Sequence, residues 1–325
     1  MSCYNLEVSS QNNQKVMIML KEKDKNLSIR IYRYCIYYIR VHGFYISYPA
    51  RESTSEYTYI INSTLEKCDG IILPDGSIIS NDAFIDKMIQ HARAMVSISD
   101  KDFEWLENSD RACMYMWIVI RNGFPDKEQN NRPTYESLYL SENPFSHQNR
   151  LDAIRNFYDR IEMSPSSKIN SLEVSKATWI RKSNEPSYFK KLDKKNEELC
   201  QWAWQYLSEK LKERTEKCGW SYINTSAGRL SPMSDHEKYL SIYGVLDTWS
   251  DSSEFKELLL LKMNKTMSQK RYRSSMVEKK IITTTLRSDT RNKLDAIATK
   301  RGIRVSEVLE WLICNEYEQQ NKREK

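Results

Sequence analysis

Positive charge concentrated near the C-terminal end is the feature of this sequence with the clearest chemical meaning. Between residues 262 and 304, thirteen lysine and arginine side chains stand against three acidic ones, a local net charge of +10. The whole chain of 325 residues carries a net charge of only +6, so the rest of it is mildly acidic. A one-sided excess of this kind is typical of a surface that binds phosphate groups, because a solvated helix face usually mixes both signs.

The elements that position these charges are a predicted strand and two predicted helices. Residues 280–286 form a β-branched run of strand length, and Ser288 follows as a helix N-cap. The helix ends at Gly302, the residue type expected just after a helix. Ser306 then caps a second amphipathic helix. The order predicted from the sequence is therefore strand, helix, helix.

A single strand of this kind leaves its backbone unpaired, so the unit requires a second copy of itself. Two copies can form an antiparallel two-stranded ribbon, which fits the major groove of DNA. Alternation along the strand directs Ile281, Thr283 and Thr285 toward the groove. The first N–H groups of the second helix, at Ser306 and beside Arg304, suit a phosphate. This arrangement is a ribbon-helix-helix, and it predicts a homodimer on double-stranded DNA.

From about residue 198 onward the sequence resembles the macrodomain Ter protein (MatP) family, on three landmarks. The first is Trp202–Leu207, which reads W-x-W-x-Y-L. The second is Trp249 followed by the basic helix at residues 262–273, and the third is the ribbon-helix-helix at residues 279–318. The resemblance implies a dimer that grips a short palindromic site and acts in chromosome or mobile-element organisation or segregation.

The resemblance also implies that the last helix of the bundle contacts DNA. The resemblance places that contact at Asn264, Lys265, Ser268 and Lys270. These four residues are predicted to contact DNA together with the ribbon and the basic residues beside it. The ribbon departs from the family at four positions that are polar or charged there, so the recognised DNA sequence is expected to differ. These positions are Ile281, Ile282, Thr283 and Thr285. The predicted DNA-binding set is Asn264, Lys265, Ser268, Lys270, Arg271, Arg273, Lys279, Lys280, Ile281, Thr283, Thr285, Arg287, Arg304 and Ser306.

The predicted fold class is mainly α with a small β-containing N-terminal region, followed by a helical bundle and the ribbon-helix-helix. Strand-like runs lie at residues 28–48, 57–61 and 71–79, the last with a Pro-Asp-Gly turn. Apolar spacing of three and four predicts helices at 82–97, 101–122, 147–162, 169–182, 188–217, 235–249 and 253–273. The predicted domains are 1–80, 81–185, 186–275 and 279–320.

Other classes of protein are disfavoured by what the sequence contains. Seven scattered cysteines without a C-x2-C pair indicate neither a disulfide framework nor a zinc site. The glycines form no phosphate-binding loop, and the four histidines have no recognisable catalytic pattern. We therefore expect no enzyme activity, cofactor, metal or membrane segment, and a cytoplasmic, nucleoid-associated protein.

Two alternatives to an organiser of DNA stay open. One is a ribbon-helix-helix transcriptional repressor whose N-terminal domain senses a ligand or binds a partner. The other is an interaction scaffold whose basic tail binds no DNA. The tyrosines and arginines of residues 30–48 suit stacking on single-stranded nucleic acid, but a half-buried sheet is the favoured interpretation. The tryptophans at 105, 117 and 179 are expected in the core.

Overall fold

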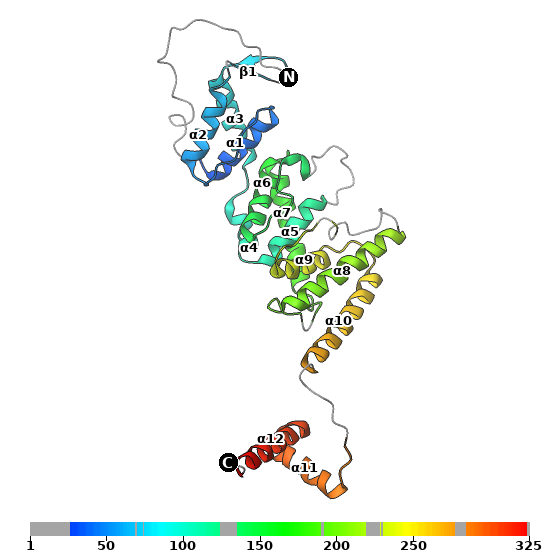
Figure 1. The fold of residues 1–325 in the computed structure, drawn as a ribbon. Coiled ribbons are helices and arrows are strands. Elements are labelled where there is room, and N and C mark those ends of the chain that lie inside the picture. Colours follow the sequence, from blue (N-terminus) through cyan, green and yellow to red (C-terminus); the bar gives the residue numbers. More distant parts are fainter. Residues whose placement is uncertain are drawn as a thin grey trace. The chain divides into compact units, whose positions relative to one another are not determined.

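The computed structural model describes residues 27–68, 70–73, 75–123, 135–189, 192–218, 228, 230–276 and 284–323. Nearly all regular structure within these ranges is helical, so the predicted mainly α fold is confirmed (Figure 1). The chain divides into two compact units, residues 1–268 and residues 269–325.

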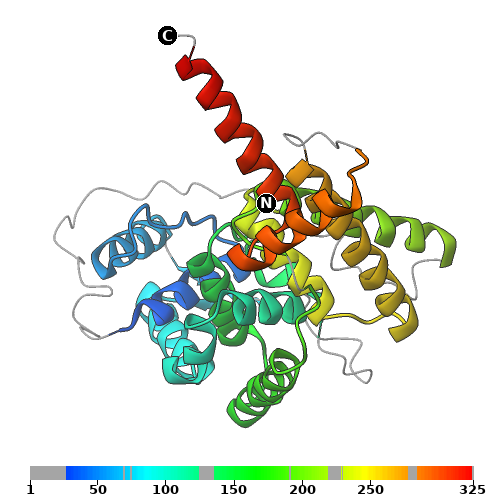
Figure 2. The ribbon, with the colours of Figure 1, turned by 90° about the horizontal axis from the view of Figure 1, so that it is seen from below.

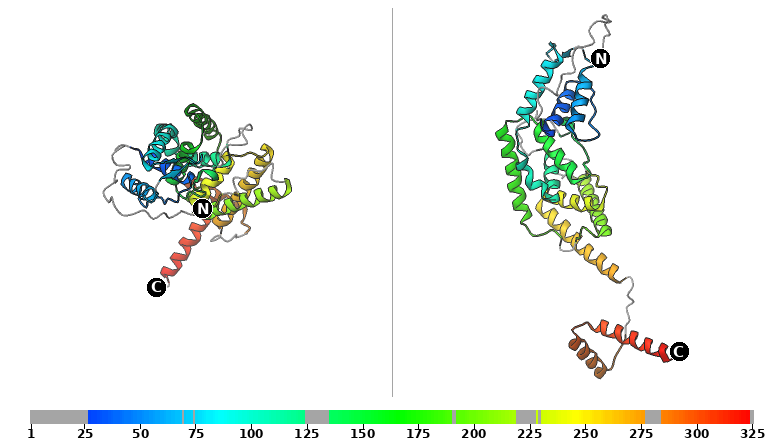
Figure 3. Two further views of the ribbon diagram at one scale, coloured as in Figure 1. Left: turned by 90° about the horizontal axis from the view of Figure 1, so that it is seen from above. Right: turned by 90° about the vertical axis from the view of Figure 1, so that its left-hand side faces the viewer.

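Three helices and a short hairpin lie together at the N-terminal end of the first unit (Figures 1 and 3). The helices are α1 (Ile29–Val41), α2 (Thr54–Leu65) and α3 (Asn81–Met95). Each begins after a serine whose hydroxyl oxygen accepts a backbone N–H bond, namely Ser28, Ser53 and Ser80. They enclose a hydrophobic core of their own.

The strands predicted at residues 28–48 and 57–61 are wrong, because α1 and α2 occupy most of these positions. Their aromatic and β-branched content favours strands. However, buried Tyr32, Ile36 and Ile39 recur at intervals of four and three, which places them on one helix face. Burial against the neighbouring helices outweighed the intrinsic preference of the residues.

The hairpin predicted at residues 71–79 is confirmed. Strand β1 (Ile71–Ile72) pairs antiparallel with β2 (Ile78–Ile79), and Gly76 in the turn has φ of 83°, which glycine adopts without steric cost. These four residues are the whole sheet of the described chain. The described part of region 1–80 is therefore mainly helical rather than β-rich.

The rest of the first unit is a helical bundle built around α5, whose residues are buried on nearly every side. Helix α5 packs against α6, α7 and α9. The elements are the 3-10 helices η1 (Asp100–Phe103) and η2 (Glu136–Leu138) with α4 (Glu104–Glu107), α5 (Asp110–Asn122), α6 (His147–Arg160), α7 (Pro165–Ser183), α8 (Glu197–Cys218), α9 (Asp235–Asp247) and α10 (Ser253–Met276). The first unit ends within α10, at residue 268.

Two of the predicted helices in the bundle need correction. The helix at 101–122 is interrupted near Asn108, because the Ser109 hydroxyl oxygen accepts a bond from the N–H of Ala112 and starts α5 afresh. The helix at 188–217 begins only at Glu197. The remaining helix predictions are confirmed to within a few residues, and the three tryptophans pack in or against the bundle core as expected.

Buried charged side chains join the N-terminal helices to the bundle. The Arg30 guanidinium of α1 donates to both oxygens of Asp159 on α6, at 3.0 and 2.6 Å, and to the carbonyl of Ile98 at 2.7 Å. Lys168 of α7 is 1% exposed, and its Nζ donates to the carbonyl of Met95 at 2.9 Å. Burial lowers the pKa of Lys168 from 10.5 to about 8.

The depressed pKa of Lys168 predicts a specific pH dependence of stability. The folded chain releases this proton at a lower pH than the unfolded chain, so the penalty for burying the charge is complete below about pH 8 and disappears as the pH rises toward 10.5. Relative to Lys168→Met, wild type should gain roughly 3 kcal/mol in free energy of unfolding over that range. Urea unfolding at several pH values measures the difference. Lys176→Met changes an exposed residue on the same helix and keeps Lys168, so its difference from wild type should be the same at every pH. A difference between wild type and Lys168→Met that does not change with pH would contradict the assignment.

A second buried ion pair fastens α5 to α9. Arg111 donates to both carboxylate oxygens of Asp247, at 2.8 and 2.7 Å, and Asp247 is fully buried. The guanidinium also lies over three aromatic rings, 4.5 Å from the Tyr243 centroid, 5.4 Å from Trp179 and 5.7 Å from Tyr188. These rings come from α9, α7 and the segment before α8, so this single side chain connects α5 to three other parts of the bundle.

Arg111→Ala should therefore be strongly destabilising. It leaves the Asp247 carboxylate buried without its cation, which costs about 3 kcal/mol or more. Thermal and denaturant unfolding measure this loss. The matched control is Lys210→Ala, which removes an exposed ion pair with Glu213 and should leave stability unchanged. Equal stability of the two variants would show that the aromatic surroundings, rather than the ion pair, hold the helices together.

The second unit contains α11 (Ser288–Arg301) and α12 (Val305–Arg323). Gly302 ends α11 in the left-handed conformation, with φ of 65°, and its N–H donates to the carbonyl of Thr299, as predicted for this glycine. The predicted caps are wrong: Ser288 and Ser306 lie inside the first turns of their helices. The second half of α12 extends beyond α11 (Figure 2).

Candidate nucleic-acid interface

Helix α10 carries a stripe of exposed basic side chains. Lys262, Lys265 and Arg273 are exposed, and at 100° per residue they lie within about 80° of the helix circumference. None of the three forms an ion pair with another described residue. Of the other predicted basic residues on this helix, Arg271 is exposed and Lys270 is half-buried. Lys262 was not among the predicted contacts, although it lies within the basic run.

Asn264 differs from its basic neighbours because it is half-buried. Its Nδ2 donates to the carbonyl of Tyr188 and to the carbonyl of Leu260, both at 3.0 Å. Ser268 is exposed, and its hydroxyl donates to the backbone carbonyl of Asn264 at 2.9 Å. The amide of Asn264 thus connects α10 to the segment before α8, a role that its sequence position does not reveal.

The two kinds of side chain on α10 should respond differently to substitution. Asn264→Ala removes hydrogen bonds to a half-buried carbonyl and should lower the free energy of unfolding by about 1 kcal/mol. Lys265→Ala removes an exposed side chain and should leave stability unchanged. Denaturant unfolding of both variants tests this. Equal stability of the Asn264 variant and wild type would show that the amide of Asn264 does not hold α10 to the segment before α8.

Part of the predicted ribbon lies outside the described residues, namely Lys279, Lys280, Ile281 and Thr283. Thr285 and Arg287 are described, and both are exposed and precede α11 without strand structure. A strand requires a hydrogen-bonded neighbour. In the predicted ribbon, this neighbour is the same segment of a second chain. Arg287 occupies the N-cap position of α11 without a capping side-chain bond.

The start of α12 is organised by Glu307 rather than by Ser306. The Glu307 carboxylate accepts from the backbone N–H of Arg304 at 3.0 Å and from its guanidinium at 3.0 and 2.7 Å. Ser306 is exposed in the first turn of the helix. Arg304 is therefore already paired with a carboxylate. The position of a basic residue before a helix predicted a phosphate contact and did not indicate this pair. Lys293 and Lys300 on α11 are exposed and form no ion pair among the described residues.

The second unit also leaves a large apolar surface uncovered. Its buried core consists of Leu294, Ala298 and Val308. Exposed apolar side chains gather on α12 and near its start: Ile303, Trp311, Leu312, Ile313 and Tyr317. The Arg301 guanidinium lies 4.0 Å from the centroid of the Trp311 ring and covers one face of it.

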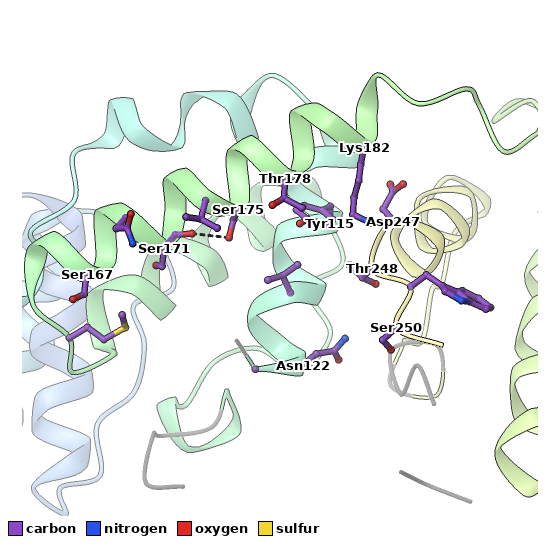
Figure 4. A pocket seen from close by; sticks show the side chains of 16 residues that line it. Tyr115, Asn122, Ser167, Ser171, Ser175, Thr178, Lys182, Asp247, Thr248 and Ser250 are labelled. Carbon is purple, nitrogen blue, oxygen red and sulfur yellow. Dashed lines mark hydrogen bonds between the residues drawn. The ribbon is translucent and has the colours of Figure 1, made fainter. Parts of the chain in front are cut away.

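A groove of about 840 Å³ lies on the bundle between α5, α7 and the end of α9 (Figure 4). Hydroxyl groups from α7 line one wall. Ser175 donates to the carbonyl of Ser171 at 2.8 Å, and Ser171 donates to the carbonyl of Lys168 at 2.9 Å. Thr248 donates to the carbonyl of Gly244. The protons of these three hydroxyl groups are donated to helix carbonyls, so Ser171, Ser175 and Thr248 offer oxygen lone pairs as acceptors.

Comparison with known proteins found no protein-family model, curated protein or solved structure that matches the chain. In the part of the chain that the structure describes, no helix combines the length and apolar character needed to cross a membrane. The same residues contain no group of three or more histidine, cysteine or acidic side chains arranged to hold a metal ion.

Proposed function

We propose that this protein is a homodimeric, sequence-specific DNA-binding protein of ribbon-helix-helix type, resembling the MatP family, that acts in chromosome or mobile-element organisation. The observation that carries the proposal is the set of exposed basic side chains on α10 and α11 without carboxylate partners among the described residues. Cations that are not neutralised within the protein are available to phosphate groups, and their binding releases counterions from DNA.

The apolar surface of α12 supports the homodimeric part of the proposal. A unit with three buried core residues gains little stability by itself, because short chains bury too small a fraction of their surface. Pairing with a second copy would cover Leu312 and Ile313 and would also provide the neighbour that the predicted strand requires. The same event would double the number of basic side chains facing one duplex.

DNA binding by the full-length chain tests the proposal. Lys265→Ala and Arg273→Ala should each weaken binding to all duplexes about equally and reduce the slope of log affinity against log salt by about 0.9 for each phosphate that is no longer neutralised. Thr285→Ala should instead change which sequence is preferred. Selection of bound sequences from random duplexes should yield a palindrome, as a two-fold symmetric dimer requires.

Lys210→Ala is the matched control, because it removes a positive charge from α8 that is paired with Glu213. It should bind DNA like wild type. Failure of wild type to retain DNA at about 0.1 M salt, where phosphate contacts still hold, would refute the proposal and favour a protein scaffold. An unchanged sequence preference after Thr285→Ala would refute the assignment of the ribbon to the groove.

A further inference from the structure

A second cleft, of about 440 Å³, lies where the N-terminal helices meet α6. Four aromatic side chains line it: Tyr48, Tyr57, Tyr139 and Phe145. Tyr57 is buried, whereas Tyr139 is 53% exposed and Phe145 is 74% exposed. Among the described residues, the Phe145 ring packs against no other aromatic ring. One face of the Tyr48 ring is covered by the Arg40 guanidinium, which lies 4.4 Å from the ring centroid. The size is typical of small-molecule sites, and the junction between two cores is a common place for them.

Tyr139 is held in place at a conformational cost. Its φ of 52° lies in the left-handed region, and it is the one residue other than glycine with positive φ in the described chain. The buried Arg160 guanidinium donates to its carbonyl at 3.0 Å and to the carbonyl of Leu138 at 2.7 Å. The same guanidinium donates to the Tyr48 hydroxyl at 3.2 Å. One buried arginine therefore positions two of the aromatic residues that line the cleft.

The charged groups of the cleft are already paired. Arg33 donates to both Glu52 and Asp152, at distances between 2.6 and 3.1 Å. Arg160 is committed to backbone carbonyls and to Tyr48. Arg33 and Arg160 together balance the charges of Glu52 and Asp152, and the N–H groups of both arginines already donate to groups within the protein. This balance favours an uncharged ligand.

Two asparagines on α6 provide hydrogen-bonding groups beside the aromatic rings. The Asn149 side-chain oxygen accepts from the Ser146 hydroxyl at 2.5 Å, which leaves its NH2 group available. The amide of Asn156 is half-buried and forms no hydrogen bond with another described residue. An asparagine amide can pair with the N6 and N7 positions of adenine through two hydrogen bonds, and aromatic rings stack on the faces of any base.

We infer that this cleft binds a purine base of the adenine type, presented as an uncharged nucleoside. The rings of Tyr139 and Phe145 contact the faces of the base, Tyr48 borders it, and the amide of Asn156 pairs with its edge. Arg160 acts as a positioning residue for Tyr48 and Tyr139. The site belongs to the first unit and does not depend on DNA binding.

Calorimetric titration of the full-length protein with adenosine tests the inference. Wild type should bind one adenosine per chain, and Phe145→Ala and Asn156→Leu should each weaken binding about tenfold. Tyr139→Gly should weaken binding as well while retaining or raising the melting temperature, because glycine adopts the left-handed conformation without strain. Tyr59→Ala, which removes an equally exposed ring outside the cleft, is the matched control and should bind normally.

Titration with adenosine monophosphate, uridine and choline distinguishes a nucleoside site from other kinds of ligand site. Adenosine monophosphate should bind no more tightly than adenosine, because Arg33 is paired with two carboxylates and buried Arg160 already donates to two carbonyls and the Tyr48 hydroxyl. Uridine should bind more weakly, because it lacks the adenine edge. Tighter binding of the monophosphate, or of choline as a probe of a cation-binding aromatic cage, would overturn the inference, as would the absence of saturable adenosine binding to wild type.

Discussion

The ion pair between Arg111 and Asp247 is the interaction on which the arrangement of the bundle depends. Taking both charges out of water is costly, and the cost is offset only because the geometry is bidentate and aromatic rings surround the guanidinium. Tyr188, one of those rings, extends the connection to α10. Its carbonyl accepts from Asn264, and the Lys256 ammonium lies 4.6 Å from its ring centroid. The basic stripe of α10 is thereby attached to the centre of the bundle.

Buried charged side chains also hold the N-terminal helices to the bundle, because they form hydrogen bonds between the two hydrophobic cores. Arg30 and Asp159 form a buried pair, and Lys168 reaches the carbonyl at the end of α3. An apolar junction could slide by small steps, whereas a bidentate pair has one satisfactory geometry. The aromatic cleft lies beside this junction, where Arg33 and Arg160 hold its walls. A site formed at such a junction has fixed dimensions, which suits recognition of a flat, rigid ligand.

The C-terminal unit follows a different principle. Its two helices bury few side chains and present both charge and apolar surface to solvent. Basic residues facing solvent are ordinary when paired with carboxylates, and Arg304 with Glu307 is one such pair. Lys293 and Lys300 on α11 form no ion pair with another described residue, so they favour a polyanionic partner, and the uncovered face of α12 favours a second copy of the chain.

The sequence by itself determined the helices with a clear spacing of apolar residues, the hairpin at residues 71–79, the glycine that ends α11 and the location of the basic run. These features depend on near neighbours in the chain, so local patterns predict them. The helices at α1 and α2 were missed because aromatic and β-branched residues favour strands locally, and only the packing of α1 against α2, α3 and α6 decided otherwise. Tertiary structure alone also separated half-buried Asn264 from exposed Lys265 and brought Tyr48, Tyr139 and Asn156 to one cleft. Those outcomes depend on which distant groups meet, and the free energy of burying a polar or charged side chain is set by the partner it finds there.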